Sequence, residues 1–125
     1  MKVVSREEIK LKNERLLKEF KIWLIDKNYQ DFTINRHFNN AKIFLNEFLL
    51  TNKKKTLSQG VDYIEEFIYD YLSDSLQYEL LNNANSIKCF YNCLYDYGHI
   101  SKEKYGEILV KVKDILKNLR QEKVR

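Results

Sequence analysis

The sequence contains no proline and only three glycines in 125 residues. Proline removes a backbone donor and glycine loosens the backbone, so a chain poor in both can form long, uninterrupted helices. Runs that alternate apolar and polar residues between turn residues, as half-buried strands do, are absent. We therefore predict an all-α fold, in which residues 1–125 form a single compact domain, a four- to five-helix bundle.

Hydrophobic periodicity and end signals divide the chain into five expected helices. Ser5 and Glu8 have the spacing of a capping box, and Ser101 is placed to cap the last helix. Gly98 is expected to end the fourth helix, because glycine adopts the left-handed conformation at little cost. Asn28 is expected to end the first helix, and Thr33 to start the second. The expected helices cover about residues 6–27, 34–50, 61–73, 79–97 and 102–121.

Apolar side chains recur on one side of each expected helix. The fourth helix has the most informative pattern. Its predicted core face consists of Leu80, Ala84, Ile87, Tyr91 and Leu94. Its predicted outer face consists of Asn82, Asn85, Cys89, Asn92 and Asp96. Both cysteines, Cys89 and Cys93, are expected to point away from the core, reduced and partly exposed.

The chain lacks the sequence signals of several protein classes. No apolar run approaches the roughly 18 residues of a membrane span, and residues 1–8 have no signal-peptide core, so we expect a cytoplasmic protein. Two cysteines four residues apart on one helix do not form a disulfide framework, and with only two histidines we expect neither a metal nor another cofactor. No glycine-rich phosphate loop, HExxH or GxSxG motif occurs, so we expect no enzymatic activity from this chain.

Charge is distributed unevenly along the sequence. The net charge is +4, yet residues 58–75 contain five acidic residues and no basic one. Residues 1–57 and 99–125 are basic, and residues 76–98 carry a net charge of −1. Because phosphates repel carboxylates, any nucleic acid should bind away from the third helix.

The second and fourth helices each combine amides with cations on the predicted outer face. These residues are Asn35, Arg36, Asn39 and Lys42 on the second helix, and Asn82, Asn85 and Lys88 on the fourth. Asparagine can pair bidentately with adenine, while arginine and lysine bind guanine or phosphate. The pattern predicts a surface that binds double-stranded DNA. The alternative is that Asn and Lys simply fill a solvated surface in a chain of this composition.

Two segments resemble a known family. FTINRHFNNAKIFLNEFLL (residues 32–50) and SIKCFYNCLYDYGHIS (residues 86–101) resemble the second and fourth helices of the N-terminal core-binding (SAM-like) domain of tyrosine recombinases and phage integrases. Lys88 stands where arginine is common in that family, followed by the aromatic pair Phe90 and Tyr91 and a terminus at Gly98. The resemblance covers about residues 16–119 and rests on hydrophobic patterns rather than catalytic signatures.

The resemblance implies a non-catalytic DNA-binding module that acts in DNA integration or recombination. It places helices two and four against duplex DNA, adds Thr33 and Asn83 to the candidate contacts, and implies self-association through the first and last helices. Glu79 and Asn82 stand where the family often has basic residues, so binding should be weak and salt-sensitive. The family's catalytic domain is absent from this sequence. The alternative is a protein-interaction module derived from the recombinase fold without DNA binding, favoured by an exposed Ile43 and the acidic third helix.

Overall fold

The computed structural model describes residues 5–53 and 55–123, apart from a few side chains. Within this part of the chain every regular element is helical, so the predicted all-α bundle is confirmed. The elements are α1 (Arg6–Asp26), α2 (Asp31–Lys42), η1 (Ile43–Lys53), η2 (Leu57–Tyr63), α3 (Ile64–Glu66), η3 (Phe67–Tyr71), α4 (Gln77–Asp96) and α5 (Lys102–Lys123). In the residues described, none of these helices has a stretch both long and apolar enough to cross a bilayer.

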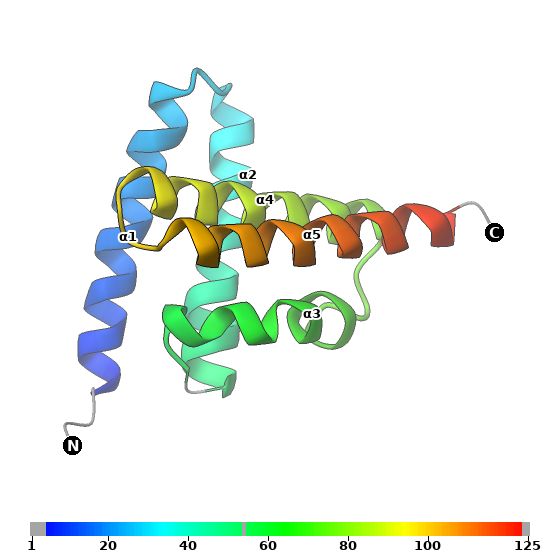
Figure 1. The fold of residues 1–125 in the computed structure, drawn as a ribbon, viewed down its shortest axis with the longest axis horizontal. Helices are drawn as coiled ribbons and strands as arrows, with labels where there is room; N and C mark the ends of the chain where they lie inside the picture. Colours follow the sequence, from blue (N-terminus) through cyan, green and yellow to red (C-terminus); the bar gives the residue numbers. More distant parts are fainter. Residues whose placement is uncertain (1–4, 54, 124–125) are drawn as a thin grey trace.

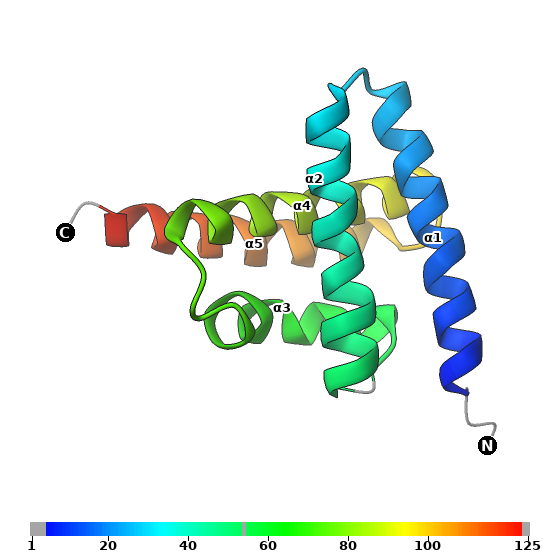
Figure 2. The ribbon, with the colours of Figure 1, turned by 180° about the vertical axis from the view of Figure 1, so that it is seen from behind.

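Two antiparallel helix pairs cross each other. Figure 1 shows α1 and α2 as a hairpin behind a second hairpin formed by α4 and α5, with the α3 segment below α5. The reverse view in Figure 2 places α2 in front of α4. Helix α4 thus lies between α2 and α5 and makes its most extensive contacts with these two helices. This central position decides which α4 side chains can reach solvent.

Most of the predicted helix ends are confirmed. The Glu8 backbone N–H donates to Ser5 Oγ at 3.1 Å, and the Lys104 backbone N–H donates to Ser101 Oγ at 3.1 Å. Asn28 and Gly98 have φ angles of 65° and 79°, the left-handed conformation that ends α1 and α4.

The start predicted for the second helix at Thr33 is wrong. The helix begins at Asp31, and the Ile34 backbone N–H already bonds to the Gln30 carbonyl at 2.9 Å. Asp31 in the first turn places a carboxylate at the positive end of the helix dipole, which favours this earlier start.

The second and third predicted helices are less regular than their sequences indicate. The second continues past Lys42 as the π-helical segment η1, which buries Phe44, Leu45, Phe48, Leu49 and Leu50. The third consists of the 3₁₀ segment η2, a single turn of α-helix and the π-helical segment η3. An apolar stripe with a period near 3.6 does not distinguish α-helix from these variants.

The core is rich in aromatic side chains and matches most predicted positions. Phe20, Phe44, Phe48, Phe67 and Phe90 are fully or almost fully buried and pack against one another through edge and stacked contacts. The positions expected in the core of α1 are buried, and so are most of those on α5, namely Ile108, Val112, Ile115 and Leu119. Tyr105 and Leu80 are half-buried, and Tyr71 is exposed. These packed aromatics hold the crossing of the two hairpins in place.

Candidate nucleic-acid interface

The α2–α4 crossing is joined by a buried polar network centred on Ser86. His37 Nδ1 lies 2.7 Å from Ser86 Oγ, and Asn40 Nδ2 donates to the same oxygen at 3.0 Å. The Ser86 hydroxyl donates to the Asn82 carbonyl at 2.9 Å. Since the single hydroxyl proton is used in that bond, His37 Nδ1 must carry the proton and donate to Ser86. This network fixes α2 against a face of α4 that the sequence pattern predicts to be exposed.

The network continues to a cysteine and a tyrosine. His37 Nε2, unprotonated in the tautomer assigned above, lies 3.9 Å from Cys89 Sγ, and the Tyr29 hydroxyl lies 4.0 Å from the same sulfur. Burial, with a smaller effect of the Arg36 charge, lowers the pKa of His37. Burial raises the pKa of the Cys89 thiol. Both groups are therefore neutral near pH 7, and the thiol lacks the lowered pKa that activates a nucleophilic cysteine.

Cys93 corrects the expectation that both thiols are partly exposed. Its side chain is completely buried, whereas Cys89 is half-buried. Burial, helped by the Glu19 and Asp96 carboxylates, raises the pKa of Cys93 to about 12. The prediction fails because α4 is enclosed by neighbouring helices on more than one side, so a position opposite the apolar stripe is also covered.

The predicted DNA contacts on α2 are well placed. Asn35, Asn39 and Lys42 are exposed and follow the i, i+4, i+7 spacing of a single helix face. Thr33 and Arg36 are half-buried. The α2 face, defined here as Asn35, Asn39 and Lys42, spans about 10 Å along the helix axis.

The predicted contacts on α4 are more enclosed. Asn82, Asn85 and Lys88 are half-buried. Asn83 is only 9% exposed, and its Nδ2 donates to the Glu79 carbonyl at 2.9 Å. It shares a helix face with Ile87 and Phe90, both of which are buried. Asn83 is therefore the least accessible of the candidate DNA contacts, because the core side of α4 holds this side chain.

Two cations from different helices meet beside the crossing. Arg36 and Lys88 are the chain neighbours of His37 and Cys89, whose side chains lie 3.9 Å apart, and both charges act on the Cys89 thiol. Neither forms an ion pair with any carboxylate in the described part of the chain. We call this pair the Arg36–Lys88 corner. Both side chains are half-buried, and the Arg36 Nε is buried without a hydrogen-bond partner among the described residues.

Two acidic residues of α4 that could interrupt this positive surface, Glu79 and Asp96, are engaged elsewhere. Glu79 accepts a hydrogen bond from the Leu76 backbone N–H at 2.9 Å, at the start of α4. Asp96, at the opposite end of that helix, accepts from Trp23 Nε1 at 2.8 Å and lies 3.9 Å from Lys27 Nζ. Two other carboxylates are exposed: Glu47 on η1, beyond the end of α2, and Asp31 in the first turn of α2, four residues before Asn35.

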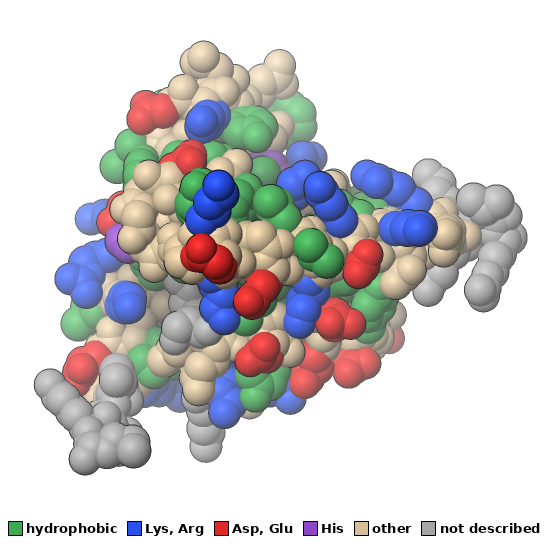
Figure 3. Space-filling view, in the orientation of Figure 1, with side chains coloured by type: hydrophobic (Ala, Val, Ile, Leu, Met, Phe, Trp, Pro, Cys, Tyr) green, Lys and Arg blue, Asp and Glu red, His purple; other side chains and the backbone are tan. Residues whose placement is uncertain are grey.

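The acidic segment lies apart from the α1–α2 tip. Figure 3 shows Asp and Glu side chains gathered at the lower right, over the α3 segment. Lysines from neighbouring elements pair with some of these acids: Lys53 with Glu66, and Lys111 with Glu65 at 3.5 Å. The first turns of α2 lie at the α1–α2 tip, and the α3 segment lies near the other end of the continuous α2–η1 helix (Figures 1 and 2). This charge separation agrees with the expectation that the third helix faces away from phosphates.

Sequence patterns alone did not reveal Tyr29, Asn40 and Ser86, which build the polar network. Each bonds to a residue 46 or more positions away, so no local spacing connects them. The position of His37 beside an apolar stripe is the one sequence signal that indicates a buried polar partner.

Comparisons with known proteins give no match: no family model, no curated protein and no solved structure is similar enough to this chain to place it in a family.

Proposed function

We propose that this chain is a non-catalytic module that binds double-stranded DNA in the manner of an integrase core-binding domain. The Arg36–Lys88 corner and the adjacent α2 face would contact the duplex. The observation that carries the proposal is that two cations from two helices lie near the His37–Cys89 contact, with no carboxylate partner among the described residues, next to the exposed amides of the α2 face. The pattern resemblance to integrases adds independent support.

The chemistry of these groups divides into two roles. Arg36 and Lys88 would bind phosphates, which fix the position of a protein on DNA without reading its sequence. Asn35 and Asn39 would reach base edges, because an amide can pair bidentately with adenine in the major groove. The major groove, about 12 Å wide, admits an α-helix, so α2 could present this face to the base edges.

DNA cleavage is not part of the proposal. The arrangement that comes nearest to a catalytic pair in the described residues is Cys89 with His37, and their environment keeps both neutral. A parent recombinase would have to supply the cleavage chemistry from another domain.

The test is fluorescence anisotropy with a labelled random-sequence duplex at low salt. The wild-type protein is compared with Arg36→Gln/Lys88→Gln and with a matched control, Lys113→Gln/Lys117→Gln, which removes two exposed charges from α5. We expect the first variant to bind several-fold more weakly and the control to bind nearly as well as wild type. Absence of wild-type binding, or equal loss in both variants, would overturn the proposal.

A second candidate function, protein interaction, is favoured by a different surface. Ile22 and Ile25 on α1 and Phe32 on α2 are 55%, 52% and 63% exposed near the tip of the first hairpin. Exposed apolar clusters of this kind mark interaction sites in soluble proteins. Ile43, which the sequence pattern predicts to be exposed, is half-buried and adds nothing to this surface.

Self-association through α1 can be tested by sedimentation velocity. If this surface joins two copies, Ile22→Lys/Ile25→Lys should convert a concentration-dependent oligomer to a monomer without unfolding the chain. A wild-type protein that remains monomeric at high concentration would exclude self-association and leave only a different protein as partner.

A further inference from the structure

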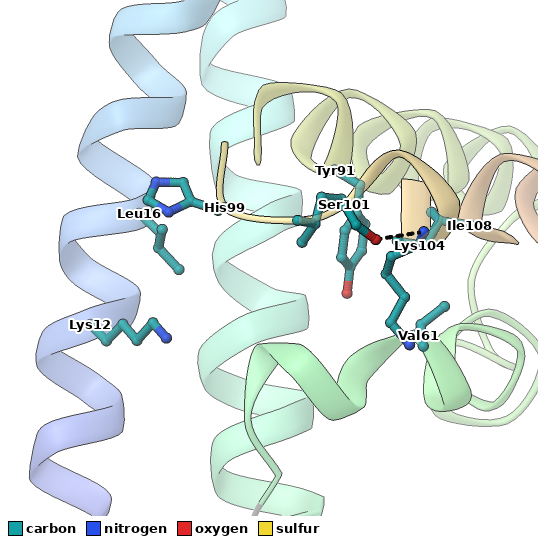
Figure 4. Close-up of a pocket in the computed structure, with 9 residues that line it drawn as sticks. Lys12, Leu16, Val61, Tyr91, His99, Ser101, Lys104 and Ile108 are labelled. Carbon is teal, nitrogen blue, oxygen red and sulfur yellow. Dashed lines mark hydrogen bonds between the residues drawn. The ribbon is translucent and has the colours of Figure 1, made fainter. Parts of the chain in front are cut away.

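A cavity of about 320 Å³ opens on the other side of α4 from the polar network. Its walls include the aliphatic side chains of Leu16 on α1, Val61 on η2 and Ile108 on α5, and the ring of Tyr91 on α4 (Figure 4). Cavities that bind small molecules typically measure about 300–1,000 Å³ and have mostly apolar walls with a few polar groups. This cavity is at the small end of that range.

Tyr91 is one of the side chains that line the cavity, and its hydroxyl is buried and unpaired among the described residues. The side chain is 2% exposed, and its hydroxyl has no hydrogen-bond partner within the described residues. In Figure 4 the ring points from α4 into the space between α1 and the η2 segment. A Cβ atom on Gly60 would lie 2.9 Å from this oxygen, so glycine lets the backbone lie close to it on that side. Native structures rarely leave a buried hydroxyl unpaired.

Two lysines extend toward the same space. Lys12 reaches it from α1 and Lys104 from the first turns of α5 (Figure 4). The N-terminus of α5, a 22-residue helix capped by Ser101, adds the positive end of its dipole. No Asp or Glu is among the residues that line the cavity. Of the nearby carboxylates, Glu19 binds His99 at 2.7 Å and Glu107 lies 3.9 Å from Lys104 Nζ.

We propose that this cavity binds a small amphipathic carboxylate. The carboxylate would accept a hydrogen bond from the Tyr91 hydroxyl and pair with the Lys104 and Lys12 ammonium groups. The apolar body would cover Leu16, Val61 and Ile108. Burial raises the pKa of Tyr91, so its hydroxyl keeps its proton and acts as a donor at neutral pH. The site is independent of the proposed DNA-binding surface, because Tyr91 and Ser86 point to different sides of α4.

The test is a ¹H–¹⁵N NMR titration of the full chain with octanoate as the probe. Octan-1-ol serves as its neutral analogue. We expect octanoate to shift the amide signals of Leu16, Val61 and Ile108, and octanol to bind more weakly. Absence of shifts at millimolar octanoate would overturn the site. Equal binding of octanol would overturn the proposed pairing with an anion.

Variants test the individual groups. Tyr91→Phe keeps the ring and should weaken octanoate binding about tenfold, the usual effect of a lost hydrogen bond to a charged group. Its control is Tyr97→Phe, an exposed tyrosine near the end of α4. Lys104→Gln, at a half-buried surface position, should weaken octanoate binding about two- to fivefold and leave octanol binding unchanged. Unchanged octanoate affinity in Tyr91→Phe would show that the hydroxyl is merely hydrated and would contradict the proposal. DNA affinity, measured in parallel, should not respond to octanoate.

Discussion

The imidazole of His37 and the hydroxyl of Ser86 lie 2.7 Å apart at the point where α2 crosses α4. Both side chains are buried, and Asn40 donates to the same serine oxygen at 3.0 Å. The surrounding core is apolar, so this contact specifies the relative position of the two helices that display the proposed DNA-binding groups. The Arg36–Lys88 corner lies beside it, since both cations act on Cys89, the next residue of the network.

Removing the serine hydroxyl should destabilise the fold. Ser86→Ala leaves His37 Nδ1–H and the Asn40 amide without their shared acceptor in a buried site. The expected loss is about 1–3 kcal/mol in the free energy of unfolding, the cost of leaving buried donors unpaired. Urea denaturation measures it. Ser73→Ala, at an exposed position, is the control and should change stability by less than about 0.5 kcal/mol. Equal stability of Ser86→Ala and wild type would contradict the structural role of this network.

Stability should fall in mildly acidic solution because of His37. Burial and the Arg36 charge lower its pKa below the ordinary value of 6.5, so the unfolded chain binds the proton more readily than the folded one. The contribution of neutral His37 is complete above about pH 6.5 and is lost as the pH falls through the lower pKa of the folded state. His37→Gln, which cannot be protonated, should show a smaller loss of stability between pH 7.5 and pH 5. Parallel pH profiles for the two proteins would contradict this assignment.

Two glycines should respond in opposite ways to alanine. Gly98 has a φ angle of 79° and open space around its missing Cβ, so Gly98→Ala has only a conformational cost, about 1 kcal/mol. Gly106 lies within α5 and also has open space, so Gly106→Ala should stabilise the protein by about 0.5–1 kcal/mol. Thermal unfolding measures both changes: the melting temperature should fall in Gly98→Ala and rise in Gly106→Ala. A Gly98→Ala variant as stable as wild type would show that α4 does not end as described.

Helix caps, helix ends and apolar stripes could be predicted from the sequence, because they depend on residues close together in the chain. Ser5 and Ser101 cap their helices, and Gly98 ends α4, because each depends on neighbouring backbone groups alone. Leu16 and Phe20 on α1, and Ile108, Val112, Ile115 and Leu119 on α5, are buried as their spacing indicates.

The surroundings of α4 could not be predicted in the same way. Asn83 and Cys93 are buried because α4 lies between two other helices, and a helical wheel does not show how many neighbours a helix has. The Ser86 network and the Tyr91 cavity depend on contacts between segments far apart in the sequence. Of the candidate DNA contacts on α2, Asn35, Asn39 and Lys42 lie at exposed positions as expected, whereas Thr33 and Arg36 are half-buried. Their function remains a prediction.

The salt dependence of duplex binding tests the central proposal most directly. Each phosphate contact contributes about 0.9 to the slope of log affinity against log salt concentration on duplex DNA. If Arg36 and Lys88 each contact a phosphate, Arg36→Gln/Lys88→Gln should reduce the magnitude of that slope by about 1.8 relative to wild type. The Lys113→Gln/Lys117→Gln control should keep the wild-type slope. An unchanged slope in Arg36→Gln/Lys88→Gln would show that the corner does not contact DNA.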